Sequence, residues 1–258
     1  MGTASHLSAR LPLEIFNLVI SFTSDTNTLC SLARCCRAFA TSTEPYLYAT
    51  LKFTPGLRAI QLARVLVRCS RKASHVLSIA AELVERDLQP FFPAGCLGGL
   101  GGPVTSLTLY GQVTPSQLEA TLPVLAQTST RIEYISLQAE ELSAKLLTLL
   151  SAYIPSLTRL EIRIVRSAMV AYSNLTSESV CQALSLLPNM KYFRLRLWCP
   201  QLFYDLWFHA QREVALDWRE YCPSLSKVVF ESSSHGKAYE WSFDEEAMDW
   251  VCSMDEYE

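Results

Sequence analysis

Five segments of this 258-residue chain repeat one pattern of apolar residues, and this repeat limits the folds that the chain can adopt. Each segment is apolar at its first, fourth and sixth positions, and successive segments start 28, 25, 33 and 35 residues apart. A period of this length is typical of proteins built from stacked units, in which each unit packs on its neighbours. The five segments are Val104–Leu109, Ile132–Leu137, Leu157–Ile162, Met190–Leu195 and Leu225–Phe230.

Amphipathic stretches lie between the repeated segments. Their apolar residues recur at helical spacing, which predicts helices that each bury one face. A strand followed by a helix, in a fixed order, predicts a solenoid with a parallel sheet. Two weaker copies of the strand pattern precede the five, ending at 51–53 and 77–79. The predicted helices span 57–71, 115–127, 142–153 and 177–187.

Composition narrows the function classes. Half of the residues are hydrophobic, which is enough to bury a sizeable core. The net charge of −3 gives no ground for a general nucleic-acid or membrane-surface role. Met1–Arg10 is polar and lacks the apolar region of a signal peptide, and no run of apolar residues reaches the length of about 20 that a membrane span needs. We therefore expect a cytoplasmic or nuclear protein.

The residues that usually carry catalysis or bind metal are scattered. None of the nine cysteines forms a CxxC pair, and none of the four histidines stands near a cysteine at ligand spacing, so we expect no metal. The glycines of 98–102 lack the lysine of a phosphate-binding loop, and we expect no cofactor. A cysteine hydrolase is the least favoured alternative, because no cysteine lies in a recognisable active-site sequence.

The first segment, from about Leu11 to Leu51, has a different pattern. Apolar stripes and the capping run Ser24–Thr28 predict three short helices. So small a unit buries little surface by itself. We expect it either to lean on the following domain as an ordinary helical cap or to offer an apolar face to a partner.

An ordered series of motifs in this segment resembles the F-box family, in the form common among fungal F-box proteins. The resemblance covers about a sixth of the chain and implies that the unit binds the Skp-type adaptor of an SCF ubiquitin ligase, and through it a cullin. The matching stretches are Leu11–Ile15, Asp25–Leu29, Cys36–Phe39 and Pro45–Leu51, with Ile20, Phe22 and Leu32 between them. The resemblance implies adaptor contacts at Leu11, Pro12, Glu14, Ile15, Ile20, Leu29 and Leu32.

The repeated body resembles leucine-rich repeats, but it lacks one of their features. The family carries Asn or Cys three residues past the last strand leucine. The corresponding residues here are Gln112, Glu140, Val165, Trp198 and Ser233. We therefore expect an α/β chain in which a small three-helix F-box precedes an irregular leucine-rich-repeat-like solenoid with a parallel sheet. The predicted boundaries are 8–51 for the F-box, 52–243 for the solenoid and 244–258 for an acidic C-terminal tail.

Alternation along the strands predicts which side chains lie on the open face of the sheet. The last three strands place five basic residues there, so we hypothesise that this half binds an acidic or phosphorylated segment. The alternative is a solvated face. The aromatic run 202–218 is either core or a substrate anchor. The candidate substrate-binding residues are Tyr134, Arg159, Arg163, Tyr192, Arg194, Arg196 and Lys227.

Together these expectations describe a non-catalytic subunit of a ubiquitin ligase. The F-box would fix the chain to the ligase, and the repeats would hold a protein substrate whose identity the sequence does not reveal. The alternative is an F-box or repeat scaffold protein with a non-degradative, protein-binding role.

Overall fold

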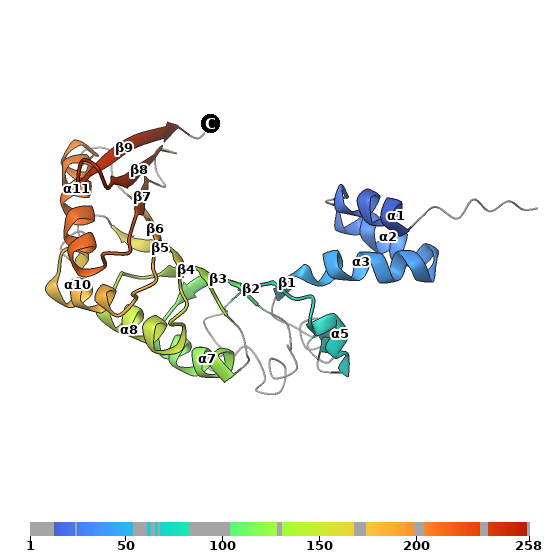
Figure 1. The fold of residues 1–258 in the computed structure, drawn as a ribbon. Helices are drawn as coiled ribbons and strands as arrows, with labels where there is room; N and C mark the ends of the chain where they lie inside the picture. The colour runs from blue at the N-terminus through green and yellow to red at the C-terminus, as the bar shows by residue number, and fades with distance from the viewer. Residues whose placement is uncertain are drawn as a thin grey trace, which may run out of the picture.

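The computed structural model shows a mixed α/β protein in which three N-terminal helices precede a nine-stranded sheet (Figure 1). It describes residues 13–23, 25–53, 61–62, 65–66, 68–82, 104–127, 131–167, 174–198, 204–232 and 237–256. The helices are α1 (Leu13–Ser21), α2 (Thr26–Cys35), α3 (Arg37–Ala49), α5 (Ser70–Ala73), α7 (Pro115–Gln127), α8 (Ala144–Tyr153), α10 (Glu178–Ser185) and α11 (Tyr204–Tyr221).

The strands lie in the sheet in the order in which they occur along the chain. Neighbours from β1 to β7 pair in parallel, whereas β8 and β9 add an antiparallel hairpin. The strands are β1 (Thr50–Phe53), β2 (Ser78–Glu82), β3 (Ser106–Val113), β4 (Tyr134–Ala139), β5 (Arg159–Ser167), β6 (Tyr192–Trp198), β7 (Lys227–Ser232), β8 (Lys237–Asp244) and β9 (Asp249–Glu256).

The repeated pattern predicts the core of this sheet correctly. The residues at the first, fourth and sixth positions of all five segments are buried, from Val104 in the first to Phe230 in the last. The two weaker copies are β1 and β2, which pair in parallel with each other. The predicted helix at 115–127 is α7, and those at 142–153 and 177–187 contain α8 and α10. Part of the helix predicted at 57–71 lies outside the described residues.

Backbone hydrogen bonds continue the sheet beyond the strand ends, so that the units stack in a fixed register. The Glu133 carbonyl oxygen accepts from the backbone amides of Thr158 and Arg159. The Thr158 carbonyl oxygen accepts in turn from those of Lys191 and Tyr192. Helices α7, α8, α10 and α11 line the outer side of the curved sheet, which leaves the inner face open (Figure 1).

An aromatic cluster fastens α11 to the sheet. The Trp218 ring stacks on Phe193 at 4.7 Å between centroids and lies 5.8 Å from Phe230. Its indole N–H donates a 2.9 Å hydrogen bond to the Leu175 carbonyl oxygen. Trp218, which belongs to the aromatic run 202–218, is therefore core, while the side chains at 204–209 of that run lie outside the described part of the chain.

The hairpin β8–β9 forms the C-terminal edge of the sheet. Trp241 of β8 is buried against α11, where its indole N–H donates to the Gln211 side-chain oxygen at 3.0 Å. Arg212 of α11 forms an ion pair with Asp249 at 2.6 Å. The segment predicted as an acidic tail from residue 244 thus contributes β9, which pairs with β8 along its length.

The three-helix unit joins the sheet without a loop, because α3 ends at Ala49 and β1 begins at Thr50. Glu44 of α3 pairs with Arg71 of α5. The Lys72 ammonium lies 5.3 Å from the centre of the Tyr48 ring, and the Tyr48 hydroxyl raises the pKa of Lys72. The C-terminal half of α3 is therefore held against the first units of the sheet.

Candidate protein-interaction surfaces

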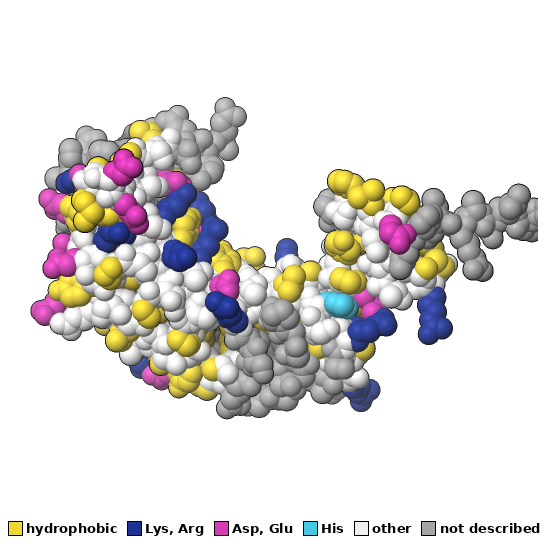
Figure 2. Space-filling view, viewed as in Figure 1, with side chains coloured by type: hydrophobic (Ala, Val, Ile, Leu, Met, Phe, Trp, Pro, Cys, Tyr) yellow, Lys and Arg dark blue, Asp and Glu magenta, His cyan; other side chains and the backbone are white. Residues whose placement is uncertain are grey.

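One face of α1 is apolar and uncovered. Ile15, Leu18 and Val19 of α1 and Phe22, the residue directly after it, follow the i, i+3, i+4, i+7 spacing of a single helical face, and all four are exposed. Phe22 is 81% exposed, which is unusual for so large an apolar side chain. Figure 2 shows hydrophobic side chains gathered on the surface of the N-terminal unit. An apolar helix face without a partner is the surface that helix-docking proteins present.

The opposite side of α1 supplies the small core of the unit. Ile20 is fully buried and Leu29 is nearly so, whereas Leu32 is partly buried. Glu14 and Ile15 are exposed, and Leu11 and Pro12 lie outside the described residues. Of the predicted adaptor contacts, Ile20 and Leu29 are thus held inside the three-helix unit, while Glu14 and Ile15 lie on its surface.

The start of α2 explains how so short a helix is stabilised. Asp25 is its N-cap, and its carboxylate accepts a 2.8 Å hydrogen bond from the Thr28 backbone amide and a 2.6 Å bond from the Thr28 hydroxyl. The two bonds from Thr28 lower the pKa of Asp25. Helix α2 packs against α3, and α1 packs on α3 in turn.

Leu18, Val19 and Phe22 were not among the predicted contacts. Their spacing was visible in the sequence, but spacing alone does not tell which of two apolar faces is covered. On α1 the face through Ile20 turns inward, and the face through Leu18 turns outward.

The open face of the sheet carries a ladder of aromatic and cationic side chains. The register places Tyr134, Arg159, Tyr192 and Lys227 side by side on β4 to β7. The Arg159 guanidinium lies 5.2 Å from the Tyr134 ring centre and 4.3 Å from that of Tyr192, within cation–π range. The Lys227 ammonium lies 6.0 Å from the centre of the same Tyr192 ring. Four of the predicted substrate-binding residues are therefore neighbours.

Glu161 of β5 already binds two side chains of this ladder, Arg159 and Tyr134. One carboxylate oxygen accepts from Arg159 at 2.7 Å, and the other accepts from the Tyr134 hydroxyl at 3.0 Å. Burial works against the charged form of Arg159, but Glu161 outweighs it and raises the guanidinium pKa. Burial and the Glu161 charge also raise the pKa of Tyr134. The cluster is a satisfied polar network rather than a free basic surface.

A second carboxylate holds two more of the predicted basic residues. Both oxygens of Glu231, whose side chain is only 11% exposed, are engaged: Arg194 approaches one at 2.6 Å and Arg196 approaches the other at 2.6 Å. Burial disfavours the charged form of Arg194, but the attraction of Glu231 prevails and raises its pKa. Lys227 pairs with Glu240 of β8 at 2.5 Å.

Arg163 is the exception among the five basic residues. It is exposed at the end of the regular part of β5, next to Arg196 in the register. Among the residues that the structure describes, no carboxylate lies within ion-pair distance of its guanidinium. Figure 2 shows the basic side chains gathered on the inner side of the curved body. The C-terminal half of the face therefore retains positive charge, but less than the sequence suggested.

Other site chemistry is scarce in the described part of the chain. No group of three or more metal-binding side chains occurs there. Burial raises the pKa of the Cys181, Cys222 and Cys252 thiols, which is the opposite of what a nucleophilic cysteine needs. Within the same residues, no helix combines the length and apolar character required to cross a bilayer.

Comparison with known proteins identifies the N-terminal unit. Residues 9–84 match the model of the COS11 F-box domain, a stretch that runs from the residues just before α1 through β2. No curated protein matches the chain. F-box domains typically bind Skp-type adaptors, and they suggest a role in substrate recognition by SCF-type ubiquitin ligases in general. F-box proteins are generally non-catalytic adaptor subunits. The match supports an F-box protein, with the F-box domain in residues 9–84.

Proposed function

We propose that this protein is the substrate-recognition subunit of an SCF-type ubiquitin ligase. The F-box docks on a Skp-type adaptor, which links the chain to a cullin scaffold, and the inner face of the sheet holds a protein substrate. The chemistry of ubiquitin transfer belongs to other subunits, and this chain contributes proximity between substrate and ligase. The work of such a complex is done in the cytoplasm or the nucleus.

The observation that carries the proposal is the uncovered apolar face of α1. Four exposed apolar side chains at one helical spacing, on a unit that matches an F-box domain, fit the helix-in-groove mode of protein recognition. Glu14 in the first turn of α1 adds a carboxylate beside this face. The predicted contacts Leu11, Pro12, Glu14, Ile15 and Leu32 stay part of the proposal, and Leu18, Val19 and Phe22 join them.

The adaptor-binding step is tested by co-purification of the full chain with a Skp-type adaptor. Wild-type chain should form a stoichiometric complex, and the double variant Leu18→Asp/Phe22→Asp should lose at least about a hundredfold in affinity, since two charges would be buried without partners. Both residues are exposed, so the variant should unfold within a few degrees of wild type. Leu186→Asp, at an exposed apolar residue next to α10, is the matched control.

The co-purification experiment can give three outcomes. If the wild-type chain does not bind the adaptor, the assignment to a ubiquitin ligase is wrong. If the α1 double variant binds as well as wild type, the adaptor docks elsewhere on the chain. If binding follows the prediction, proteasome inhibition decides between a degradation receptor and the non-degradative scaffold: a protein trapped on the sheet should accumulate only in the first case.

A further inference from the structure

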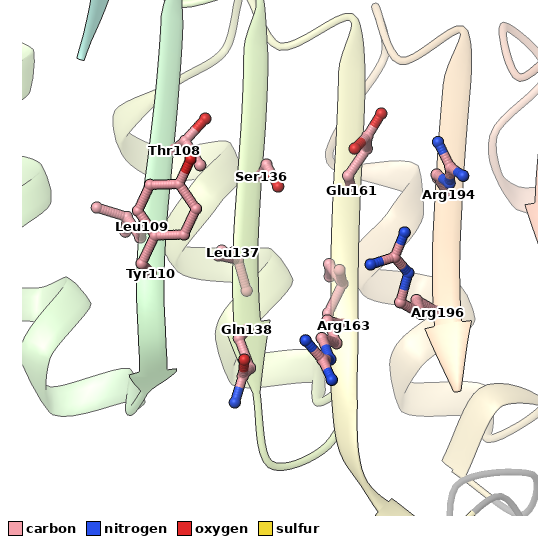
Figure 3. Close-up of a pocket in the computed structure, with 11 residues that line it drawn as sticks. Thr108, Leu109, Tyr110, Ser136, Leu137, Gln138, Glu161, Arg163, Arg194 and Arg196 are labelled. Atoms are coloured by element: carbon pink, nitrogen blue, oxygen red, sulfur yellow. The ribbon is translucent and has the colours of Figure 1, made fainter. Parts of the chain in front are cut away.

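A hollow lies on the inner face of the sheet over β3 to β6 (Figure 3). Its volume is about 180 Å³, which is room for more than one water molecule. Thr108 and Ser136 stand side by side in the register and are smaller than their neighbours along the face, so a depression forms over them. Tyr110 of β3 lines one side, and Arg163 and Arg196 of β5 and β6 line the other.

Two irregularities in the sheet border this hollow. The register between β3 and β4 shifts after Leu109, and Gly111 has a φ of 86°, a left-handed conformation that glycine adopts without steric cost. The register between β5 and β6 shifts after Arg163. Bulges of this kind re-aim side chains and are common beside functional sites. They place Tyr110 and Arg163 at the ends of the regular pairing on opposite sides of the hollow.

The charges around the hollow are unevenly compensated. Glu161 is engaged by Arg159 and Tyr134, and Glu231 is engaged by Arg194 and Arg196. Arg163 has no such partner among the described residues. Positive charge on this wall is therefore in excess of the carboxylates that face it. A ligand with a negative charge at Arg163 would gain attraction without displacing an existing ion pair.

Glu161 also lines the hollow, but both of its carboxylate oxygens already accept hydrogen bonds from Arg159 and Tyr134. The other polar groups of the lining are hydrogen-bond donors or can act as donors. The hydroxyls of Thr108 and Ser136 and the side-chain amide of Gln138 line it together with the guanidinium groups. A phosphate monoester carries close to two negative charges and three acceptor oxygens, and a guanidinium meets it with two parallel N–H bonds. The set of donors therefore suits a phosphate better than a single carboxylate, which has fewer acceptor sites and half the charge.

The shape of the site favours a phosphate carried by a polypeptide. The hollow is an open depression in a sheet face, so a small ion would be held from one side only. A peptide that crosses the strands would also cover the exposed Tyr110 ring on one side of the hollow and the partly buried rings of Tyr134 and Tyr192 beside it. Tyrosines supply contact area at low entropic cost.

We propose that this hollow receives a phosphorylated serine or threonine side chain of the protein substrate, with Arg163 as its principal ligand. The inference rests on the proposed function, in which the same face holds the substrate. It narrows the predicted basic surface to one site, because Arg159, Arg194 and Lys227 are already paired with carboxylates of this chain. Of these three residues, only Arg194 lines the hollow. Arg196 lies beside Arg163 and contributes its unengaged N–H groups.

The test uses fluorescence anisotropy on the full chain without an adaptor, so that it does not depend on adaptor binding. The probe is a labelled eleven-residue mixed-sequence peptide library with one fixed central phosphoserine, compared with libraries that carry serine or glutamate there. The phosphoserine library should bind at least about tenfold more tightly than the serine library, as expected of hydrogen bonds to a charged group. Added salt should reduce that preference.

Four variants locate the site. Arg163→Gln should reduce binding of the phosphoserine library to the level of the serine library, and Arg163→Lys should give an intermediate affinity, because lysine keeps the charge but loses the guanidinium fork. Ser136→Leu fills the hollow without changing the charge and should also remove the preference. Lys145→Gln removes one positive charge from α8 on the outer layer and should leave binding unchanged.

Three results would overturn the inference. Equal binding of the phosphoserine and serine libraries would show that phosphate is not recognised, and equal binding of the glutamate library would show a carboxylate site. Competition by inorganic phosphate at the same concentration as the phosphopeptide would assign the hollow to the free ion. The proposed function has a separate readout: adaptor binding of the wild-type chain can fail or succeed whatever the peptide libraries do.

Discussion

At the scale of single residues, burial decides which cysteines can react. Cys181 and Cys222 are buried, and burial raises the pKa of both thiols. The Cys222 thiol also donates weakly to the Leu187 carbonyl oxygen at 3.5 Å. A thiol whose pKa is raised by folding stabilises the folded state fully below its ordinary pKa. That contribution is lost as the pH rises through the raised, folded-state pKa.

This difference predicts a two-class labelling pattern. In native protein at pH 7, a maleimide should modify the exposed Cys30, Cys35 and Cys36. Cys181 and Cys222 should stay unmodified until denaturant is added or the pH is raised well above the ordinary thiol range, since only the thiolate reacts. Peptide mass spectrometry after timed labelling gives the measurement. Rapid native labelling of Cys181 or Cys222 at pH 7 would contradict the burial and revive the cysteine hydrolase.

At the scale of elements, one tryptophan holds α11 on the sheet. Trp218 is fully buried between Phe193 and Phe230 and donates to the Leu175 carbonyl oxygen. Trp218→Ala should lower the free energy of unfolding by about 3–5 kcal/mol, because it leaves a large cavity and an unpaired carbonyl. Trp218→Phe should cost less, because it keeps an aromatic ring in the stack. Urea unfolding followed by circular dichroism measures both.

The outer face of the same helix provides the control for that measurement. Leu216 is exposed on α11 two residues before Trp218, so Leu216→Ala should change stability by no more than about 0.5 kcal/mol. A similar loss for the Leu216 and Trp218 variants would mean that helix propensity, not docking on the sheet, governs this element.

The sequence predicts the elements better than it predicts their surfaces. Apolar spacing alone locates the buried positions of five strands and the whole of α7, because burial in a solenoid repeats with the chain. The ion pairs of the open face depend instead on register. Glu231 reaches Arg194 only because β6 and β7 are neighbours. Lys227 meets Glu240 only because the chain turns back and β8 pairs with β7 in the antiparallel direction. The repeated pattern does not predict this antiparallel strand.

The same limit applies to the proposed adaptor-binding surface. Apolar residues on α1 can be found from their period, but the buried and exposed faces are assigned by the packing of α2 and α3. Arg163 likewise stands out only when the partners of the other basic residues are known. Site residues whose role depends on a neighbour's charge are therefore visible in the structure and not in the repeat.

At the scale of the whole molecule, the joint between α3 and β1 fixes the F-box relative to the sheet. No loop separates Ala49 from Thr50, and the Leu77 backbone amide donates to the Ala49 carbonyl oxygen at 2.9 Å. The pairs Glu44–Arg71 and Tyr48–Lys72 hold α3 on α5. Figure 1 shows α3 leading directly into the first strand. Under the proposed function, a substrate on the sheet would thus be presented at a set position relative to the adaptor.

This rigidity has a measurable consequence for the proposed function. Insertion of Gly-Ser-Gly-Ser between Ala49 and Thr50 should leave adaptor binding and peptide binding within about twofold of wild type, since neither surface is altered. Ubiquitin transfer to a bound substrate should fall several-fold, because a flexible linker lowers the effective concentration of substrate at the ligase. Small-angle X-ray scattering of the chain should show a larger maximum dimension.

The same insertion after Glu246, in the turn between β8 and β9, is the control and should change neither ubiquitin transfer nor the maximum dimension. Unchanged transfer with a lengthened joint would mean that reach, rather than a fixed orientation, is what the ligase requires of this subunit.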